Sequence, residues 1–108
     1  MELFEVAVKK FRVLDPADES AEMGPLISAG QRTSVDSFVD EKSVAFRGSA
    51  PSGPGFWYPP TVLESSDGTD RAFREEIFGP VVSVLRFENE AEAIRVANDS
   101  PYGLSGSI

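Results

Sequence analysis

Apolar side chains recur at helical spacing near the beginning of the chain. Apolar residues occupy positions i, i+3, i+4 and i+7, and this spacing predicts one face of a short amphipathic helix. The residues of that face are Phe4, Ala7, Val8 and Phe11. Asp15 and Pro16 end this pattern, and the polar stretch 15–26 is predicted to be irregular.

A capping pattern opens a second predicted helix. Ser28 is followed three residues later by Gln31, the spacing of a capping box, in which side chains bond the free amides of a helix start. The helix is expected to end near Asp40. Arg32 and Asp36 stand four residues apart on its polar side and are predicted to pair. Its buried residues are expected to be Val35, Phe38 and Val39.

Three segments have the residue types of strands. Ser43 to Arg47 alternates apolar and polar positions. Trp57 to Leu63 contains two prolines, which cannot donate ladder hydrogen bonds, so an edge or irregular strand is expected there. Val81 to Phe87 is almost continuously apolar and β-branched, which favours a strand covered on both faces.

The second half of the chain also predicts helices. Asp70 begins one or two helical turns, and Asn89 with Glu92 caps a longer helix. The inward residues of that longer helix are expected to be Ala93, Ile94 and Ala97. Leu104 to Ile108 is predicted to begin another strand, and because the chain stops inside it, a piece of a longer protein is expected. This order of elements predicts an α/β layer with at least one right-handed parallel crossover.

Composition narrows the classes of function. The apolar fraction of 41% and the charged fraction of 26% are those of a globular chain. The formal net charge of −8 argues against nucleic acid and against an anionic membrane surface as partners. No apolar run approaches the roughly 20 residues of a membrane span, and the first residues do not resemble a secretory signal, so a cytoplasmic location is expected.

The sequence contains neither cysteine nor histidine. It therefore offers no thiolate nucleophile, no imidazole base and no Cys/His zinc site, and no metal ligands are expected. The glycine-containing stretch 48–55 lacks both the P-loop ending and dinucleotide-fingerprint spacing, which favours a plain surface loop. The aromatic run 56–58 is expected to pack on an edge strand rather than to stack on a ligand.

The segment REEIFGPV, residues 74–81, is the candidate site. Gly79 and Pro80 predict a sharp bend that would fix the direction of the residues before it. A carboxylate there could accept hydrogen bonds from the vicinal hydroxyls of a ribose, and Phe78 could offer a flat apolar surface to a heteroaromatic ring. The alternative is that Glu75 and Glu76 are surface acids of a helix and that Phe78 belongs to the core.

Four blocks of the chain together resemble the aldehyde dehydrogenase superfamily, in the order and near the spacing of that family. They are MGPLIS (23–28), GFWYPPTVL (55–63), REEIFGPVVSVLRF (74–87) and EAEAIRVANDSPYGLSGSI (90–108). The resemblance implies that residues 1–108 are an internal fragment of the catalytic domain, with the nucleotide-binding and oligomerisation parts absent. It implies an α/β layer of mostly parallel sheet with flanking helices.

The resemblance also implies chemistry. In that family a cysteine attacks an aldehyde to give a thiohemiacetal, hydride passes to NAD(P)⁺, and the thioester is hydrolysed with help from a glutamate. Glu76 matches the residue that binds the nicotinamide ribose, and Phe78 matches the aromatic beside the nicotinamide. Gln31 stands where some members place a polar side chain near the adenosine ribose, but Ser34 replaces the basic residue of those members.

The chain also departs from the family pattern, and these departures limit what it is expected to do alone. The catalytic cysteine, the general-base glutamate and the Gly-rich nucleotide turn are missing, and the stretch 38–46 looks shorter than in the family. The chain alone is therefore expected to be inactive and to bind NAD or NADP weakly or not at all. The alternative hypothesis is a free-standing, non-catalytic domain with a folding or association role, which could self-associate through exposed apolar surface. The choice between NAD and NADP, and the identity of the aldehyde, stay open, although blocks 23–28 and 55–63 are also similar to amino-aldehyde and betaine-aldehyde branches.

Overall fold

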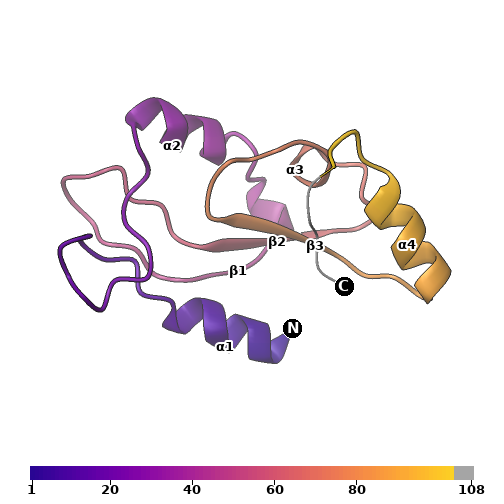
Figure 1. Cartoon of the computed structure of the whole chain (residues 1–108), viewed down its shortest axis with the longest axis horizontal. Helices are drawn as coiled ribbons and strands as arrows, with labels where there is room; N and C mark the ends of the chain where they lie inside the picture. Colours follow the sequence, from indigo (N-terminus) through magenta and orange to yellow (C-terminus); the bar gives the residue numbers. More distant parts are fainter. Residues whose placement is uncertain (104–108) are drawn as a thin grey trace.

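A computed structural model of the chain describes residues 1–103 and shows a small sheet with helices around it (Figure 1). In Figure 1, α1 lies alongside β1, whereas α2 and α4 lie toward opposite ends of the sheet. The elements in chain order are α1 (Glu2–Lys10), α2 (Ala29–Asp36), the 3₁₀ helix η1 (Glu41–Ser43), β1 (Val44–Arg47), β2 (Thr61–Ser65), α3 (Arg71–Arg74), β3 (Val81–Leu85) and α4 (Glu90–Asn98). The strand expected at 104–108 lies outside the described residues.

The sheet has three strands in the order β1-β2-β3 and is mixed. β1 pairs with β2 antiparallel, with a register shift between Val44 and Phe46. β2 pairs with β3 in parallel, from Thr61 opposite Val81 to Ser65 opposite Leu85. The predicted α/β class and the parallel crossover, which carries α3, are confirmed. The predicted mostly parallel sheet is borne out only in part, because one of the two pairings is antiparallel.

Two strand predictions need correction. The strand expected at 57–63 as an edge is the central strand β2, which begins only at Thr61 and therefore leaves both prolines outside its ladder. The carbonyl of Pro60 accepts a hydrogen bond from the Gly48 amide at 2.8 Å, so this proline contributes as an acceptor. β3 was expected to be covered on both faces, but it is an edge strand of the described sheet, and Val82 is 50% exposed.

The predicted helix starts are confirmed by their caps. The side chains of Ser28, Asp70 and Asn89 accept hydrogen bonds from the amides of Gln31, Phe73 and Glu92 respectively. Such bonds provide acceptors for the amides of a helix start, which have no carbonyl four residues earlier within the helix. These signals were readable from the sequence because a cap and its amide are only three residues apart.

Other helix details differ from the predictions. α2 ends at Asp36 rather than near Asp40. Asp36 accepts a hydrogen bond from the Tyr58 hydroxyl at 3.0 Å, and the predicted pairing with Arg32 does not occur among the ion pairs of residues 1–103. In α4, Ala93 is buried as expected, but Ile94 is 50% exposed and Ala97 is also exposed.

The main core lies between α2 and the sheet. It consists of the buried residues Val35, Tyr58, Leu63, Ile77 and Val81. Phe38 and Val39, predicted to be buried, pack against it while partly exposed. Because Ile77 belongs to this cluster, the stretch of chain before β3 is fixed against α2.

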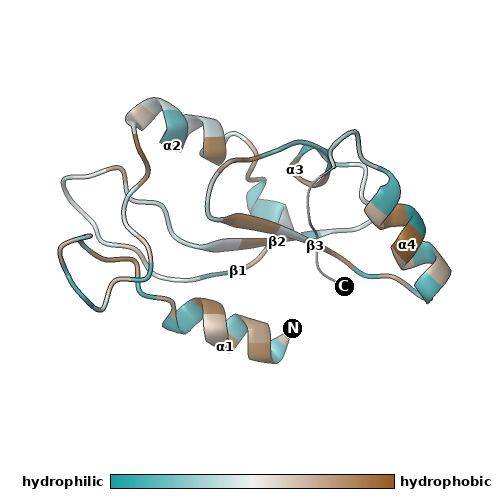
Figure 2. Cartoon of the chain, viewed as in Figure 1, coloured by the Kyte–Doolittle hydropathy of each residue, from teal (hydrophilic) through white to brown (hydrophobic). Residues whose placement is uncertain are grey.

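The helix α1 covers β1 from the other side. The ring of Phe4 meets the ring of Phe46 edge-on, with centroids 5.7 Å apart. No residue of α1 is fully buried, and Leu3 is 87% exposed. Figure 2 shows apolar and polar positions alternating along α1 and α4, whereas β3 is apolar except at Ser83. Within residues 1–103, every helix is too short or too polar to cross a membrane.

Candidate functional site

The candidate site is the short loop of residues 75–80, between α3 and β3. α3 is only one turn long, and its end directs the chain into an extended conformation at Glu75, with φ −116° and ψ 156°. Ile77 then enters the core and is 8% exposed. The residues on either side of it, Glu76 and Phe78, are both exposed. One buried side chain therefore fixes a loop that presents its neighbours to the outside.

The two adjacent carboxylates are not equivalent. Glu75 is bound by Arg71, whose Nε lies 3.0 Å from Oε2 of the glutamate, four residues away. Arg71 is itself held against the segment that follows α2, because its guanidinium lies over the Phe38 ring, 3.8 Å from the centroid. Glu76 accepts no side-chain hydrogen bond and no ion pair from any residue in the described range 1–103. Of the two, Glu76 is the carboxylate left available to a ligand.

Phe78 is not a core residue. Its side chain is 76% exposed, and its backbone has φ +54°, in the left-handed region that side chains other than glycine seldom adopt. The alternative interpretation of Phe78 as part of the core is therefore wrong for this chain. An exposed aromatic ring beside a free carboxylate offers a flat apolar surface and a hydrogen-bond acceptor within three residues of one another.

The bend at Gly79 and Pro80 is present, and its geometry requires glycine. A Cβ added at Gly79 would lie 2.5 Å from Cγ2 and 3.0 Å from Cγ1 of Val35, which is completely buried in α2. The amide of Val81 donates to the Gly79 carbonyl at 2.7 Å, and the amide of Thr61 donates to the Pro80 carbonyl at 2.9 Å. The bend is thus bonded both to itself and to β2.

Gln31 meets the same loop from the first turn of α2. Its Nε2 donates to the Phe78 carbonyl at 2.9 Å, across 47 residues of sequence. The capping box is therefore only half formed: Ser28 caps the Gln31 amide at 3.0 Å, but the Gln31 side chain turns toward the loop. Ser34, which replaces a basic residue of the family, is exposed. Sequence reasoning singled out Gln31 but did not find its contact with Phe78.

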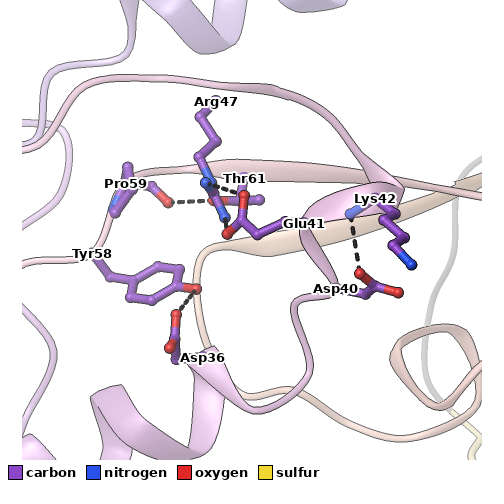
Figure 3. Close-up of polar contacts among 8 residues, drawn as sticks. All are labelled: Asp36, Asp40, Glu41, Lys42, Arg47, Tyr58, Pro59 and Thr61. Carbon is purple, nitrogen blue, oxygen red and sulfur yellow. Dashed lines mark hydrogen bonds and ion pairs between the residues drawn. The ribbon is translucent and has the colours of Figure 1, made fainter.

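A polar cluster next to this site was missed by sequence reasoning (Figure 3). The Tyr58 hydroxyl donates to Asp36 at the end of α2, and burial, followed by this hydrogen bond, raises the pKa of Tyr58 to about 12. Arg47 binds Glu41 through both terminal nitrogens, at 3.0 and 2.7 Å. These hydrogen bonds lower the pKa of Glu41 and raise the pKa of Arg47. These bonds tie α2 to the segment before β2, and η1 to β1.

The chain is similar to known proteins over its whole length. The family model of the aldehyde dehydrogenase family matches residues 1–108. The chain belongs to the aldehyde dehydrogenase family. The resemblance carried by the four sequence blocks is thereby confirmed, and so is the assignment to a family of oxidoreductases.

Aldehyde dehydrogenases from several bacteria are similar to this chain. Geranial dehydrogenase of Castellaniella defragrans is 39% identical over 94% of the chain and 22% of its own length. Betaine aldehyde dehydrogenase of Brucella ovis is 43% identical over 93% of the chain and 22% of its own length. The crystal structure of betaine aldehyde dehydrogenase from Staphylococcus aureus in complex with NAD⁺ superimposes with a TM-score of 0.83 at 37% identity, over 95% of the chain and 22% of that structure. The chain thus spans about a fifth of the length of the aldehyde dehydrogenases it matches.

The residues of the loop fit the ribose end of a nicotinamide dinucleotide. A free carboxylate such as that of Glu76 can accept two hydrogen bonds from a vicinal diol, and the exposed ring of Phe78 can lie against a heteroaromatic ring. No group of three or more carboxylate, imidazole or thiol side chains in residues 1–103 is arranged to hold a metal ion.

Proposed function

We propose that this chain is part of the catalytic domain of an NAD(P)⁺-dependent aldehyde dehydrogenase, in which it contributes Glu76 and Phe78 to the nicotinamide end of the cofactor site. One observation carries the proposal. Of the two adjacent glutamates, Glu75 forms an ion pair with Arg71, whereas Glu76 is exposed and has no such partner in the described residues. The loop that carries Glu76 is fixed by the close packing of Gly79 against Val35.

Each residue of the loop has a separate task in this proposal. The Glu76 carboxylate accepts hydrogen bonds from the hydroxyls of the nicotinamide ribose, and Phe78 bounds the nicotinamide side of the pocket. NAD(P)⁺ held there would supply the two-electron acceptor that oxidation of an aldehyde to a carboxylate requires. Holding the ribose orients that acceptor relative to the substrate, and orientation of this kind is a large part of enzymatic rate enhancement.

The remaining chemistry belongs to other parts of the enzyme in this proposal. The 108 residues hold no cysteine, so the thiol that forms the thiohemiacetal with the aldehyde comes from elsewhere. The same applies to the glutamate that assists thioester hydrolysis, to the Gly-rich turn of the nucleotide domain and to the oligomerisation segments. The isolated chain is accordingly expected to oxidise no aldehyde and to bind NAD⁺ or NADP⁺ weakly at best.

The proposal can be tested in a chimeric enzyme. The matching stretch of the Brucella ovis betaine aldehyde dehydrogenase, which is 43% identical, is replaced by this sequence, and NAD⁺ reduction with aldehyde is followed by absorbance. We expect NAD⁺-dependent oxidation, with Glu76→Gln lowering kcat/KM for NAD⁺ about tenfold or more and Glu75→Gln leaving it within about twofold. A soluble, folded chimera that oxidises no aldehyde would contradict the proposal.

A second candidate function is association through exposed apolar surface. Leu3 on α1 and Ile27 before α2 are each 87% exposed, which is unusual for large apolar side chains. In the first proposal other parts of the enzyme cover these residues, whereas a free-standing domain would bury them in a second copy. Sedimentation equilibrium of the 108-residue chain decides between them: a dimer that Leu3→Lys or Ile27→Lys dissociates supports the second candidate, and a monomer removes it.

A further inference from the structure

The backbone of Phe78 is in a conformation that needs outside support. A β-carbon makes the left-handed region unfavourable, and such residues persist where surrounding contacts over-determine them. The side chain of Phe78 supplies little of that support, since it is 76% exposed and φ is +54°. The stabilising contacts must therefore act on the backbone of the loop.

Two residues on one face of α2 make those contacts. Gln31 and Val35 are four residues apart, so their side chains lie one above the other on the helix. The side-chain Nε2 of Gln31 donates to the Phe78 carbonyl at 2.9 Å. One turn further, the methyl groups of Val35 pack so closely on Gly79 that no β-carbon fits there. The peptide between Phe78 and Gly79 is thus bound on one side and packed on the other by the same helix.

The cap of α2 leaves the Gln31 side chain free for this contact. In a full capping box the third residue of the helix bonds back to the cap, but here only Ser28 bonds, to the Gln31 amide at 3.0 Å. The helix start is satisfied by Ser28, and the Gln31 side chain is used 47 residues away. This use of the side chain is not required for helix formation.

We propose that Gln31 is a positioning residue for the cofactor site: its hydrogen bond to the Phe78 carbonyl holds Phe78 in the left-handed conformation and so sets how Glu76 and Phe78 are presented. The effect on cofactor binding rests on the proposed function, but the hydrogen bond itself is present in the chain without a ligand. Val35 limits the position of Gly79, and Gln31 selects the orientation of the peptide that precedes it. Gln31 acts through Phe78 whether or not it touches the ligand.

The test replaces the donor while keeping the helix. Gln31→Glu removes the amide donor, and a glutamate at this position completes the capping box and suits the helix start. Arg32→Gln is the matched control, because it also lowers the net charge by one in the same turn, and the exposed Arg32 side chain makes no hydrogen bond or ion pair with the loop in the described residues. Both variants are made in the isotope-labelled 108-residue chain without cofactor.

The readout is the nuclear Overhauser cross-peak between the amide proton and the α-proton of Phe78, which is strong only when φ is positive. If the loop has two conformations, loss of the hydrogen bond lowers the equilibrium constant in favour of the bonded conformation about fivefold. We therefore expect Gln31→Glu to weaken this cross-peak about twofold or more and to move the Gly79 amide resonance. In Arg32→Gln both signals should match the wild type. A Phe78 cross-peak of unchanged intensity in Gln31→Glu would overturn the proposal.

The variant Phe78→Gly shows whether Gln31 acts by positioning Phe78 or by stabilising the helix in general. Glycine adopts positive φ at little cost, so Phe78→Gly removes the need for the hydrogen bond. In that background Gln31→Glu should leave the loop resonances unchanged and the chain folded, even if the single variant unfolds. A double variant that still rearranges or unfolds would show that Gln31 acts on the helix and not through Phe78. Because no NAD⁺ is present, these results stand apart from the proposed function, which is tested separately by the activity of the chimeric enzyme and its Glu76 variant.

Discussion

Two loops rich in glycine and proline lead into the parallel strands, and they are held in different ways. The long loop of residues 48–60 precedes β2, and its positive φ angles fall on glycines, Gly53 at +104° and Gly55 at +119°. The short loop of residues 75–80 precedes β3, and its positive φ falls on Phe78. Glycine adopts such angles unaided, whereas phenylalanine requires contacts from elsewhere.

The contacts of the two loops differ in part, although the long loop is also bound from outside, by the Leu26 amide on the Phe56 carbonyl at 2.9 Å. Inside the long loop, the indole of Trp57 donates to the Pro54 carbonyl at 2.7 Å, a bond between neighbours in sequence. The short loop is bound by α2, through Gln31 and Val35. A loop whose backbone is fixed by another element can present side chains in one orientation, which is what a binding site requires. We therefore propose the short loop, with its exposed Glu76 and Phe78, as the site.

The largest expected effect comes from adding one methyl group to the short loop. Gly79→Ala sets a β-carbon against the methyl groups of Val35 and should lower the free energy of unfolding by about 2–3 kcal/mol. Gly53→Ala in the long loop meets nothing within 4 Å, so its cost of about 1 kcal/mol comes from the backbone alone. Urea denaturation of both variants measures the difference.

A second substitution shows whether packing explains that cost. In a Val35→Ala background the clash is relieved, so Gly79→Ala should cost about 1 kcal/mol less than in the wild type. The cost of Gly53→Ala should not change, since the two sites share no contact. Equal costs of Gly79→Ala in both backgrounds would mean that Val35 does not limit the loop.

The next effect concerns the end of the long loop, where Tyr58 attaches it to α2. The folded chain raises the pKa of Tyr58 from its ordinary value of 10.0 to about 12, through burial and the hydrogen bond to Asp36. A raised pKa stabilises the fold below pH 10, and this stabilisation is lost as the pH rises to about 12. The free energy of unfolding should fall by at most about 2–3 kcal/mol over that range. Tyr58→Phe should remove this part of the pH dependence, and a Tyr58→Phe curve parallel to the wild type would refute the account.

The smallest effect is expected inside the long loop. Trp57→Phe removes the hydrogen bond to Pro54, and because the indole is partly exposed the loss should be about 0.5 kcal/mol or less. The amide resonances of residues 76–79 should not move. If they shifted as much as those of residues 53–57, the two loops would be coupled, and the contrast between them would not hold.

Local signals in the sequence predicted part of this fold. The caps at Ser28, Asp70 and Asn89 act over three residues, so spacing alone identified them. The bend at Gly79 and Pro80 was also readable. The Arg71–Glu75 pair, at helical spacing of four, could have been found in the same way and would have distinguished the two glutamates in advance.

The features that were missed depend on contacts distant in sequence. The prolines at 59 and 60 suggested an edge strand, but β2 begins after them, and its central position is set by pairing with β1 and β3. The contact of Gln31 with Phe78 spans 47 residues, and no local pattern indicates it. The exposure of Phe78 likewise depends on how the whole loop is placed, and residue type alone favoured the core.

The central claim is that Glu76, not Glu75, receives the ribose of the cofactor. The most direct measurement is a titration of the isotope-labelled 108-residue chain with NAD⁺, comparing the wild type with Glu76→Gln and Glu75→Gln. The account predicts weak binding, with a Kd on the order of 1 mM or above, and amide shifts confined to residues 76–79 that Glu76→Gln abolishes and Glu75→Gln retains. Saturable shifts at residues 76–79 that persist unchanged in Glu76→Gln would contradict it.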